Sequence, residues 1–214
     1  MRKEVIDVIS ENKIIAIVRG AAPDEAVHAA RAIFEGGVKL IEVTFNQKAP
    51  ESFSETVRAI RAIKESIPEM TVGAGTVLTK EQVDLAISAG AEYIVSPDTD
   101  VEVIKYTVEN GLVSLPGAYT PSEVKLAYNA GADFVKLFPC TDVKYLKALK
   151  APMSHIKLLA VGGVNTENAA EFLKAGAVGV GVGSSLVNKE YLEKGEYDKI
   201  TAIARALVES VKEK

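Results

Sequence analysis

The hydrophobic positions of the chain fall into eight short runs, which are separated by longer and more polar stretches. The runs are rich in Val and Ile, and they cover residues 14–18, 38–45, 71–75, 93–96, 112–115, 133–138, 156–161 and 178–182. Most of them are apolar throughout, which is typical of strands that are covered on both faces. The stretches between them have the length and periodicity of helices, so the pattern predicts eight βα units with parallel strands.

Four of the junctions between these units share a glycine-ended helix. In residues 34–43, 87–95, 128–137 and 173–182, a helical segment ends in Gly-Gly or Ala-Gly and an apolar run follows at once. Glycine at such a position adopts the left-handed conformation that ends a helix. The junctions recur at about every second βα unit, which suggests a barrel with pairwise duplication.

Both ends of the chain are predicted to be helical. Val5, Ile6 and Ile9 share one face of an N-terminal helix, and residues 196–212 form an amphipathic helix that is expected to close the barrel wall.

We therefore expect an α/β fold with a single domain over residues 1–214, a (β/α)₈ TIM barrel with an extra N-terminal helix. A doubly wound open sheet is the alternative. It is disfavoured because no Gly-x-Gly-x-x-Gly follows the first run and because eight units are enough to close a barrel.

Composition and charge narrow the classes of partner. The 214 residues are 48% hydrophobic and 25% charged, and 25 Lys and Arg against 29 Asp and Glu give a net charge of −4. A mildly acidic chain without a polybasic run gives no electrostatic reason to bind nucleic acid. The chain has no apolar stretch long enough to span a bilayer, and its N-terminal segment lacks the apolar core of a signal peptide.

The single cysteine, Cys140, excludes an internal disulfide and fits a reduced cytoplasmic setting; we interpret it as an apolar filler rather than a nucleophile.

Lys136 places a charge inside the sixth apolar run. Side chains alternate along a strand, so Lys136 shares a face with Phe134 and Phe138. Burial among aromatic rings favours the neutral amine and lowers the lysine pKa. A neutral amine can attack a ketone, so imine formation with a 2-oxo acid is one interpretation, and a structural lysine in a buried ion pair is the other.

Glu42 and Arg19 are the other charged candidates. Glu42 shares a face of the second run with Leu40 and Thr44, and Lys136 is its natural partner if both face inward. A carboxylate beside an imine lysine can move protons, although a buried pair without chemistry has the same pattern. Arg19 ends the first run, where a guanidinium can bind a carboxylate through two hydrogen bonds or form a salt bridge at the rim.

The ends of the other strands offer neutral groups, and active sites on TIM barrels lie at the C-terminal ends of the strands. Residues 73–76 offer backbone N–H groups and a Thr hydroxyl, while residues 95–97 and 114–117 form Pro-containing turns. We therefore expect the substrate to contact Thr44, Gly75, Thr76, Pro97 and Pro116 in addition to Arg19.

Two glycine turns, at residues 162–168 and 181–186, follow the seventh and eighth runs. In TIM barrels these loops often bind phosphate through backbone N–H groups. We expect the same of Gly162, Gly163, Gly183 and Ser184, although simple loop geometry also explains such turns.

Residue patterns that bind metals are absent from the sequence. It has no His-Glu-x-x-His or paired Asp-x-Asp spacing, and His28 and His155 are expected to be structural or exposed. We therefore expect neither a metal nor another cofactor, with an imine as the electron sink.

Six segments together resemble those of a known family, the class I 2-keto-3-deoxy-6-phosphogluconate / 4-hydroxy-2-oxoglutarate (KDPG/KHG) aldolases. The segments occur in a consistent order from about Lys13 to the C-terminus: Ile-Glu-Val-Thr (41–44), Val-Gly-Ala-Gly-Thr-Val-Leu (72–78), Leu-Pro-Gly (115–117), Lys-Leu-Phe-Pro (136–139), Gly-Gly-Val (162–164) and Gly-Ser-Ser-Leu (183–186).

The resemblance implies specific roles for these residues. Lys136 is expected to form the imine and Glu42 to carry the proton, while Thr76 and Arg19 hold the pyruvoyl carboxylate and the glycine turns hold the phosphate. It also implies a cytoplasmic homotrimer of Entner–Doudoroff carbohydrate metabolism. The expected reaction is reversible cleavage of the phosphogluconate-derived substrate to pyruvate and glyceraldehyde 3-phosphate, with 4-hydroxy-2-oxoglutarate cleaved to pyruvate and glyoxylate.

Two positions depart from the gluconate-type pattern. Asn46 replaces an arginine that is common there, and Val161 replaces a threonine before the Gly-Gly turn. These positions look closer to the related 6-phosphogalactonate aldolases, which gives an alternative substrate.

Two further alternatives follow from the residues alone: a phosphosugar isomerase or epimerase that uses Glu42 as its base, and a non-catalytic barrel that binds a phosphate ligand.

Overall fold

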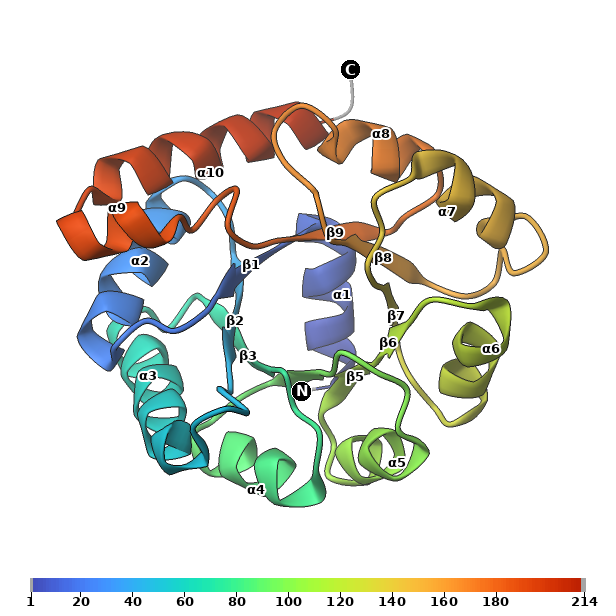
Figure 1. The fold of residues 1–214 in the computed structure, drawn as a ribbon, viewed down its shortest axis with the longest axis horizontal. Coiled ribbons are helices and arrows are strands. Elements are labelled where there is room, and N and C mark those ends of the chain that lie inside the picture. Colours follow the sequence, from blue (N-terminus) through green and yellow to red (C-terminus); the bar gives the residue numbers. More distant parts are fainter. Residues whose placement is uncertain (1, 213–214) are drawn as a thin grey trace.

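A sheet of parallel strands forms the centre of the molecule in a computed structural model that describes residues 2–212. The nine strands are ordered β5-β4-β3-β2-β1-β9-β8-β7-β6. They are β1 (Ile14–Val18), β2 (Leu40–Thr44), β3 (Thr71–Gly75), β4 (Tyr93–Val95), β5 (Val113–Leu115), β6 (Gly117–Ala118), β7 (Val135–Leu137), β8 (Leu158–Val161) and β9 (Gly179–Val182). Figure 1 shows these strands around a central axis, with helices as an outer ring. The fold is therefore an α/β barrel.

The two edges of the sheet meet at Pro116. This residue alone separates β5 from β6 in the chain. Across the gap, the Lys136 N–H donates to the Pro116 carbonyl at 2.9 Å, and the Phe134 N–H donates to the Ser114 carbonyl at 3.4 Å. These contacts leave the barrel nearly closed. Each of the eight predicted runs contains a strand, whereas the two-residue β6 was not predicted because its segment was interpreted as a turn.

Helices follow the strands and cover the outside of the barrel, apart from the N-terminal helix, which precedes the first strand. They are α1 (Arg2–Asn12), α2 (Pro23–Glu35), α3 (Phe53–Ser66), α4 (Lys80–Ser88), α5 (Val101–Glu109), α6 (Pro121–Asn129), α7 (Val143–Lys150), α8 (Ala169–Lys174), α9 (Lys189–Lys194) and α10 (Tyr197–Val211), with a 3₁₀ turn at Pro50–Ser52. The predicted last helix is α10, while α9 was not predicted. None of the helices in residues 2–212 is both long and apolar enough to cross a membrane.

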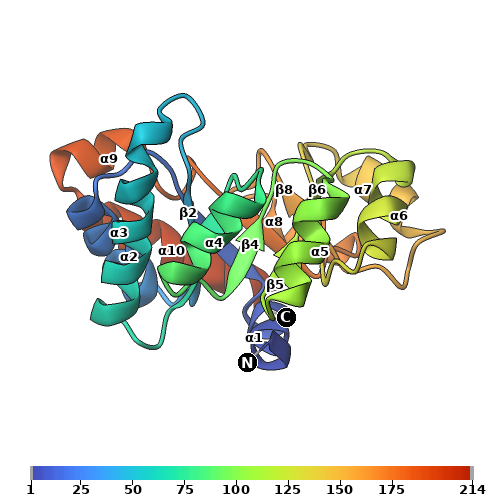
Figure 2. The same ribbon diagram turned by 90° about the horizontal axis from the view of Figure 1, so that it is seen from below.

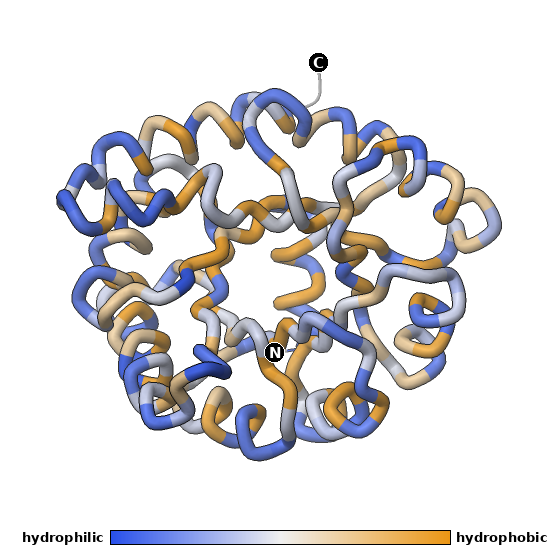
Figure 3. Tube along the Cα trace, viewed as in Figure 1, coloured by the Kyte–Doolittle hydropathy of each residue, from blue (hydrophilic) through white to orange (hydrophobic). Residues whose placement is uncertain are grey.

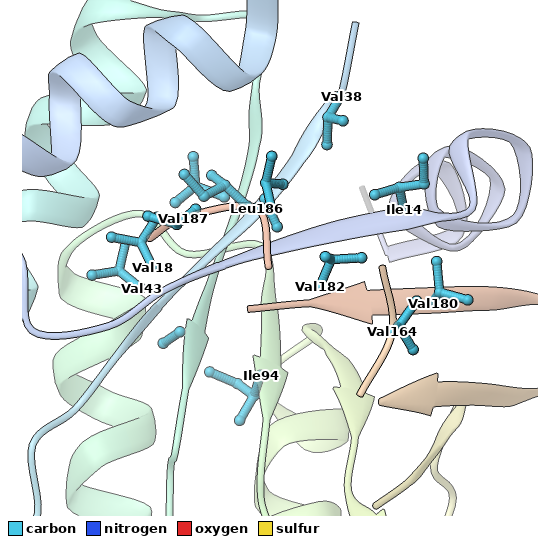
Figure 4. Packing of buried hydrophobic residues seen from close by; sticks show 14 of the residues in the cluster. Ile14, Val18, Val38, Val43, Ile94, Val164, Val180, Val182, Leu186 and Val187 are labelled. Carbon is cyan, nitrogen blue, oxygen red and sulfur yellow. The ribbon is translucent and has the colours of Figure 1, made fainter. Parts of the chain in front are cut away.

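The sequence of each strand divides its side chains between two apolar layers. Val18, Val43 and Val182 pack outward beneath the helices, as Figure 4 shows for part of this outer layer. Leu40 and Phe134 instead point to the barrel axis. Figure 3 shows the resulting pattern, with apolar residues along the strands and most polar residues at the periphery.

Helix α1 closes the N-terminal end of the barrel. Its buried residues Val5 and Ile9 belong to the inner apolar cluster, together with Ile15, Tyr93 and Phe134 from the beginnings of strands. In the side view of Figure 2, α1 lies beneath the barrel. The opposite end, where the strands terminate, is left for a functional site.

The predicted glycine-ended helices are confirmed. Gly37, Gly90, Gly131 and Gly176 have φ values of 96°, 86°, 102° and 107°. Glycine takes this left-handed conformation without the steric penalty that a Cβ atom brings, so each helix ends sharply before the next strand.

Candidate active site

Lys136 and Glu42 line one small cavity inside the barrel. The cavity has a volume of about 10 Å³, close to the space of a single water molecule. Its remaining walls are mostly apolar: Ile15, Ile17, Val95, Leu115, Leu159, Val161 and Gly181. An amine from the middle of β7 and a carboxyl group from the middle of β2 therefore share an apolar environment.

Alternation along β2 brings Glu42 into the interior. Leu40, two residues earlier, lies in the inner cluster, and only 2% of Glu42 is exposed. The carboxyl group lies against Gly75 of β3, where an added Cβ atom would be 2.9 Å from Glu42 Oε1. Burial raises the pKa of Glu42, and the charges of Lys136 and then Arg19 partly oppose this shift. Burial therefore favours the protonated form of the Glu42 carboxyl group.

Lys136 occupies the matching position on β7. It is 7% exposed, and its Nζ lies 4.8 Å from the centre of the Phe138 ring. Burial lowers the pKa of Lys136; Glu42 acts against this shift, and the charge of Arg19 adds to it. Among residues 2–212 no ion pair within 4.0 Å joins Lys136 to Glu42, so the amine is not held by a tight salt bridge.

These shifts favour a neutral amine beside a neutral acid. A neutral lysine attacks carbonyl carbon, and a neighbouring carboxylic acid can donate the proton that a departing hydroxyl group needs. The pair is therefore suited to forming and breaking an imine. The interpretation of Lys136 as a residue of a close ion pair is not supported by this geometry.

An open cleft of about 910 Å³ lies next to the inner cavity. Ile17, Val161 and Gly181 line both, so the two spaces share a wall. The cleft is also lined by five of the residues predicted to bind substrate: Arg19, Gly162, Gly163, Gly183 and Ser184. A substrate can therefore reach the Lys136 cavity from a cleft that carries an exposed guanidinium and two glycine turns.

The two glycine turns are tied together. Ser185 Oγ donates to the Val164 carbonyl at 2.6 Å, which links the turn after β9 to the turn after β8. Gly162 and Gly163 have φ values of 112° and 70°. Within residues 2–212 the N–H groups of Gly163 and Ser184 have no hydrogen-bond acceptor, so both are available to an anion.

The other predicted substrate contacts lie around these spaces and do not line them. Thr44 Cγ2 would be 3.0 Å from a Cβ atom on Gly75, so both residues lie beside Glu42. The Pro116 carbonyl accepts from the Lys136 N–H, and the Pro97 carbonyl packs against Gly117. All are at the C-terminal side of the barrel, where the prediction placed them.

Thr76 has a left-handed backbone, with φ of 57°. Gln47 and Gln82 contact this turn through their side chains, and the sequence interpretation missed both. Gln82 lies in α4 and is only 3% exposed, and this burial is visible in the structure and not in the sequence pattern.

Cys140 and the histidines lie outside this chemistry. Burial raises the pKa of the Cys140 thiol to about 11, which suits the predicted filler role rather than a nucleophile. His28 and His155 are exposed and contact the rings of Tyr197 and Tyr128. In the part of the chain that the structure describes, no group of three or more His, Cys, Asp or Glu could hold a metal ion.

Comparison with known proteins gives consistent matches over nearly the whole chain. The family model "KDPG and KHG aldolase" matches residues 5–203. The KHG/KDPG aldolase of Escherichia coli (strain K12) is 34% identical over 208 residues, which are 96% of this chain and 95% of the relative. The 2-dehydro-3-deoxy-6-phosphogalactonate aldolase of the same strain is 37% identical over 202 residues, 92% of this chain and 96% of the relative.

The fold comparison agrees with these matches. A crystal structure of KDPG aldolase from Legionella pneumophila, with pyruvate captured at low pH as a covalent carbinolamine intermediate, superposes with a TM-score of 0.85. It is 26% identical in sequence, and the match covers 94% of this chain and 97% of that one.

Proposed function

The chain belongs to the KDPG and KHG aldolase family, and from this premise we propose that it cleaves 2-dehydro-3-deoxy-6-phosphogluconate reversibly to pyruvate and glyceraldehyde 3-phosphate. It is a class I aldolase, a carbon–carbon lyase that works through a Schiff base. The same chemistry cleaves 4-hydroxy-2-oxoglutarate to pyruvate and glyoxylate.

Lys136 is the proposed nucleophile. Its neutral amine adds to the C2 carbonyl of the substrate and forms a carbinolamine, and protonated Glu42 gives a proton to the departing hydroxyl group. Water leaves and a protonated imine remains. The burial of both side chains shifts their pKa values toward the neutral amine and the protonated acid, the forms that this step needs.

Glu42 is then the proposed base for bond cleavage. Its carboxylate takes the proton of the C4 hydroxyl group, the C3–C4 bond breaks, and the bonding electrons move into the imine to form an enamine. The aldehyde leaves through the open cleft. Glu42 returns the proton to C3, and water hydrolyses the resulting imine to release pyruvate and the free amine of Lys136.

The cleft offers groups for both ends of the substrate. We assign the pyruvoyl carboxylate to Arg19 and Thr76, with Thr44, Gly75, Pro97 and Pro116 shaping that side of the pocket. The phosphate is assigned to Gly162, Gly163, Gly183 and Ser184, which line the cleft. The free N–H groups of Gly163 and Ser184 support this placement, because backbone amides bind phosphate oxygens without a cation.

The 6-phosphogalactonate-derived substrate is a second candidate. The relative with that activity is 37% identical to the chain, against 34% for the KHG/KDPG aldolase. Val161 lines both the cavity and the cleft, and Asn46 is exposed two residues after β2, the strand that carries Glu42. The two substrates differ in configuration at one hydroxyl-bearing carbon. A comparison of kcat/KM for both of them and for 4-hydroxy-2-oxoglutarate identifies the preferred substrate.

The shared cavity of Lys136 and Glu42 is the observation that carries the proposed mechanism. Borohydride reduces an imine to a stable secondary amine, so treatment in the presence of pyruvate is expected to attach a three-carbon adduct to Lys136. Lys136→Met is expected to abolish both adduct and turnover while the circular dichroism spectrum stays unchanged.

Lys157→Met is the matched control, since Lys157 is exposed and its Nζ also lies near a ring, 5.1 Å from Phe134. It is expected to retain adduct and turnover. An adduct on another lysine, or full turnover in Lys136→Met, contradicts the mechanism. Turnover that survives borohydride and pyruvate points to an isomerase or epimerase, and ligand-induced stabilisation without turnover points to a binding protein.

We further propose a domain organisation, an oligomeric state and a cellular location for the protein. Residues 1–214 are assigned to one domain, and β5, Pro116 and β6 are counted as one interrupted strand, which makes the barrel a (β/α)₈ barrel with α1 as the extra helix. A homotrimer is supported by large apolar side chains on the surface, among them Tyr119, Leu126 and Tyr128. A cytoplasmic location fits the single free cysteine.

A further inference from the structure

We propose that Gln47 and Gln82 form a side-chain clamp that holds the Thr76 peptide in its left-handed conformation and thereby positions Thr76 for the substrate carboxylate. The inference rests on the proposed role of Thr76 in the aldolase reaction. Gln47 and Gln82 are positioning residues in this proposal, because they act through Thr76 and lie outside the two cavities.

The backbone of Thr76 is strained. Its φ of 57° is uncommon for any residue with a Cβ atom and especially for a β-branched one. Such a conformation is unfavourable and persists only where the surroundings enforce it. The neighbouring peptides are fixed, because the Gly75 carbonyl accepts from the Phe45 N–H at 2.9 Å and the Val77 N–H donates to the Val95 carbonyl at 3.2 Å.

Gln47 supplies the contact to the strained residue itself. Its Nε2 donates to the Thr76 carbonyl at 2.6 Å, across a sequence separation of 29 residues. Gln47 follows β2 by three positions, so this bond connects the loop after the Glu42 strand to the loop after β3. A rotation of the Thr76 peptide to negative φ would move its carbonyl away from Gln47 and break the bond.

Gln82 holds the Gln47 side chain in place. Its Nε2 donates to Gln47 Oε1 at 3.1 Å, and its own Oε1 accepts from the Leu78 N–H at 2.7 Å. The side chain is held at its base as well, since the Gln82 N–H donates to Thr79 Oγ1 in the first turn of α4. Gln82 therefore bridges the Thr76 turn and the side chain that supports it.

The polar groups in this arrangement are mutually satisfied. Gln82 is 3% exposed, and a buried amide that is left without a partner is destabilising. Gln47 orients with its amide nitrogen toward Thr76 because its oxygen is needed by Gln82. This directional chain selects one orientation of the Thr76 peptide, which is the property that a carboxylate-binding residue requires.

The first test removes the Gln47 amide and keeps the size of the side chain. Gln47→Met is expected to raise KM for pyruvate in the condensation direction about 5- to 30-fold, the loss that a hydrogen bond of about 1–2 kcal/mol implies. Competitive inhibition by inorganic phosphate is expected to be unchanged, because the glycine turns do not contact Gln47. Lys48→Met is the matched control, since Lys48 is adjacent and exposed; its KM for pyruvate is expected to equal that of the unmodified enzyme.

A double-mutant cycle separates positioning from simple stability. Thr76→Val is expected to raise KM for pyruvate by itself, and Gln47→Met combined with Thr76→Val is expected to be no worse than Thr76→Val alone, because both act through one contact. Gln47→Glu, which keeps an acceptor but loses the donor, is expected to behave like Gln47→Met. Melting temperatures of all variants are measured, so that each KM is recorded on folded protein.

The outcomes are distinguishable. If Thr76→Val leaves KM for pyruvate unchanged, the proposed role of Thr76 is wrong and the clamp has no function to serve. If Thr76→Val raises KM while Gln47→Met does not, or if the two effects are additive, the clamp is wrong and the proposed aldolase site stands. A Gln47→Met variant that loses only melting temperature also contradicts the inference, since a structural role alone moves that quantity.

Discussion

Arg19 acts on both groups that the proposed chemistry needs. Its positive charge lowers the pKa of Lys136 and lowers that of Glu42, while burial of each side chain is the larger cause of the shift. For the lysine the two effects add, and for the carboxyl group they oppose each other. The exposed guanidinium of Arg19 in the cleft thus favours the neutral, nucleophilic amine of Lys136. It also partly offsets the rise in the pKa of Glu42.

This arrangement predicts opposite pH shifts in two variants. The amine attacks only when neutral, so imine formation is lost as the pH falls through the pKa of Lys136. Arg19→Gln removes a charge that lowers this pKa, so the acidic limb of the pH–rate profile for imine formation is expected to move to higher pH. Glu42→Gln removes the carboxyl group whose negative charge, where it is ionised, raises this pKa, so the limb is expected to move to lower pH, with turnover reduced about 10²- to 10⁴-fold.

The measurement is the rate of borohydride-trapped adduct formation with pyruvate across a pH series. Lys48→Met serves as the control, because its exposed side chain lies outside the two cavities and its limb is expected to coincide with that of the unmodified enzyme. Shifts in the same direction for Arg19→Gln and Glu42→Gln contradict the electrostatic account.

Residue positions along strands were predictable from the sequence, whereas contacts between loops were not. Alternation placed Lys136 with Phe134 and Glu42 with Leu40, and burial on one face follows directly from that period. Gln47 and Gln82 meet across 35 positions and depend on how two loops are brought together. No local pattern of apolar or charged residues in the sequence indicates such a contact, so only the three-dimensional structure reveals the clamp.

At the scale of elements, α1 closes the end of the barrel opposite the site, so it is expected to affect stability rather than catalysis. Ile9 is fully buried in the inner cluster, while Ile6 on the same helix is half-buried. Ile9→Ala is expected to lower the free energy of unfolding by about 2–5 kcal/mol, because it removes buried methyl groups and leaves a cavity. Ile6→Ala is expected to cost less than half as much.

Urea unfolding followed by circular dichroism measures this difference, with aldolase kcat determined on the folded variants. Both variants are expected to keep the kcat of the unmodified enzyme at low temperature. Equal destabilisation by the two substitutions, or loss of kcat in folded Ile9→Ala protein, would show that α1 does not act as a simple closure of the barrel.

Element lengths explain which parts of the fold the sequence predicted. Strands β1 and β3 have the predicted bounds, and α10 differs from its prediction by one residue at each end, because long apolar or amphipathic patterns identify these elements. The two-residue β6 and the six-residue α9 carry too few periods to stand out. Pro116 added to this difficulty, since a proline between two short apolar segments is equally typical of a turn.

For the whole molecule, three of the exposed large hydrophobic side chains are in or next to one helix, α6. Tyr119 and Leu126 are each 48% exposed, and Tyr128 is 44% exposed, all in or next to α6. Tyr145 of α7 stacks on Tyr119 with ring centres 5.1 Å apart, and its hydroxyl donates to the Tyr119 carbonyl, which fixes the two rings. Exposed aromatic and aliphatic side chains of this kind are typical of protein interfaces.

If this surface forms the proposed trimer contact, a charge at its centre prevents assembly. Leu126→Glu is expected to convert a trimeric mass into a monomeric one in light scattering after size-exclusion chromatography, because burying an unpaired carboxylate in an apolar interface is costly. Lys125→Glu on the same helix is the control: Lys125 is exposed and the substitution changes the net charge more, yet the mass is expected to stay trimeric. A trimeric Leu126→Glu variant would place the interface on another face, and a monomeric unmodified chain would overturn the homotrimer itself. Because Leu126 lines neither cavity, kcat in a monomeric variant also tests whether one barrel is sufficient for catalysis.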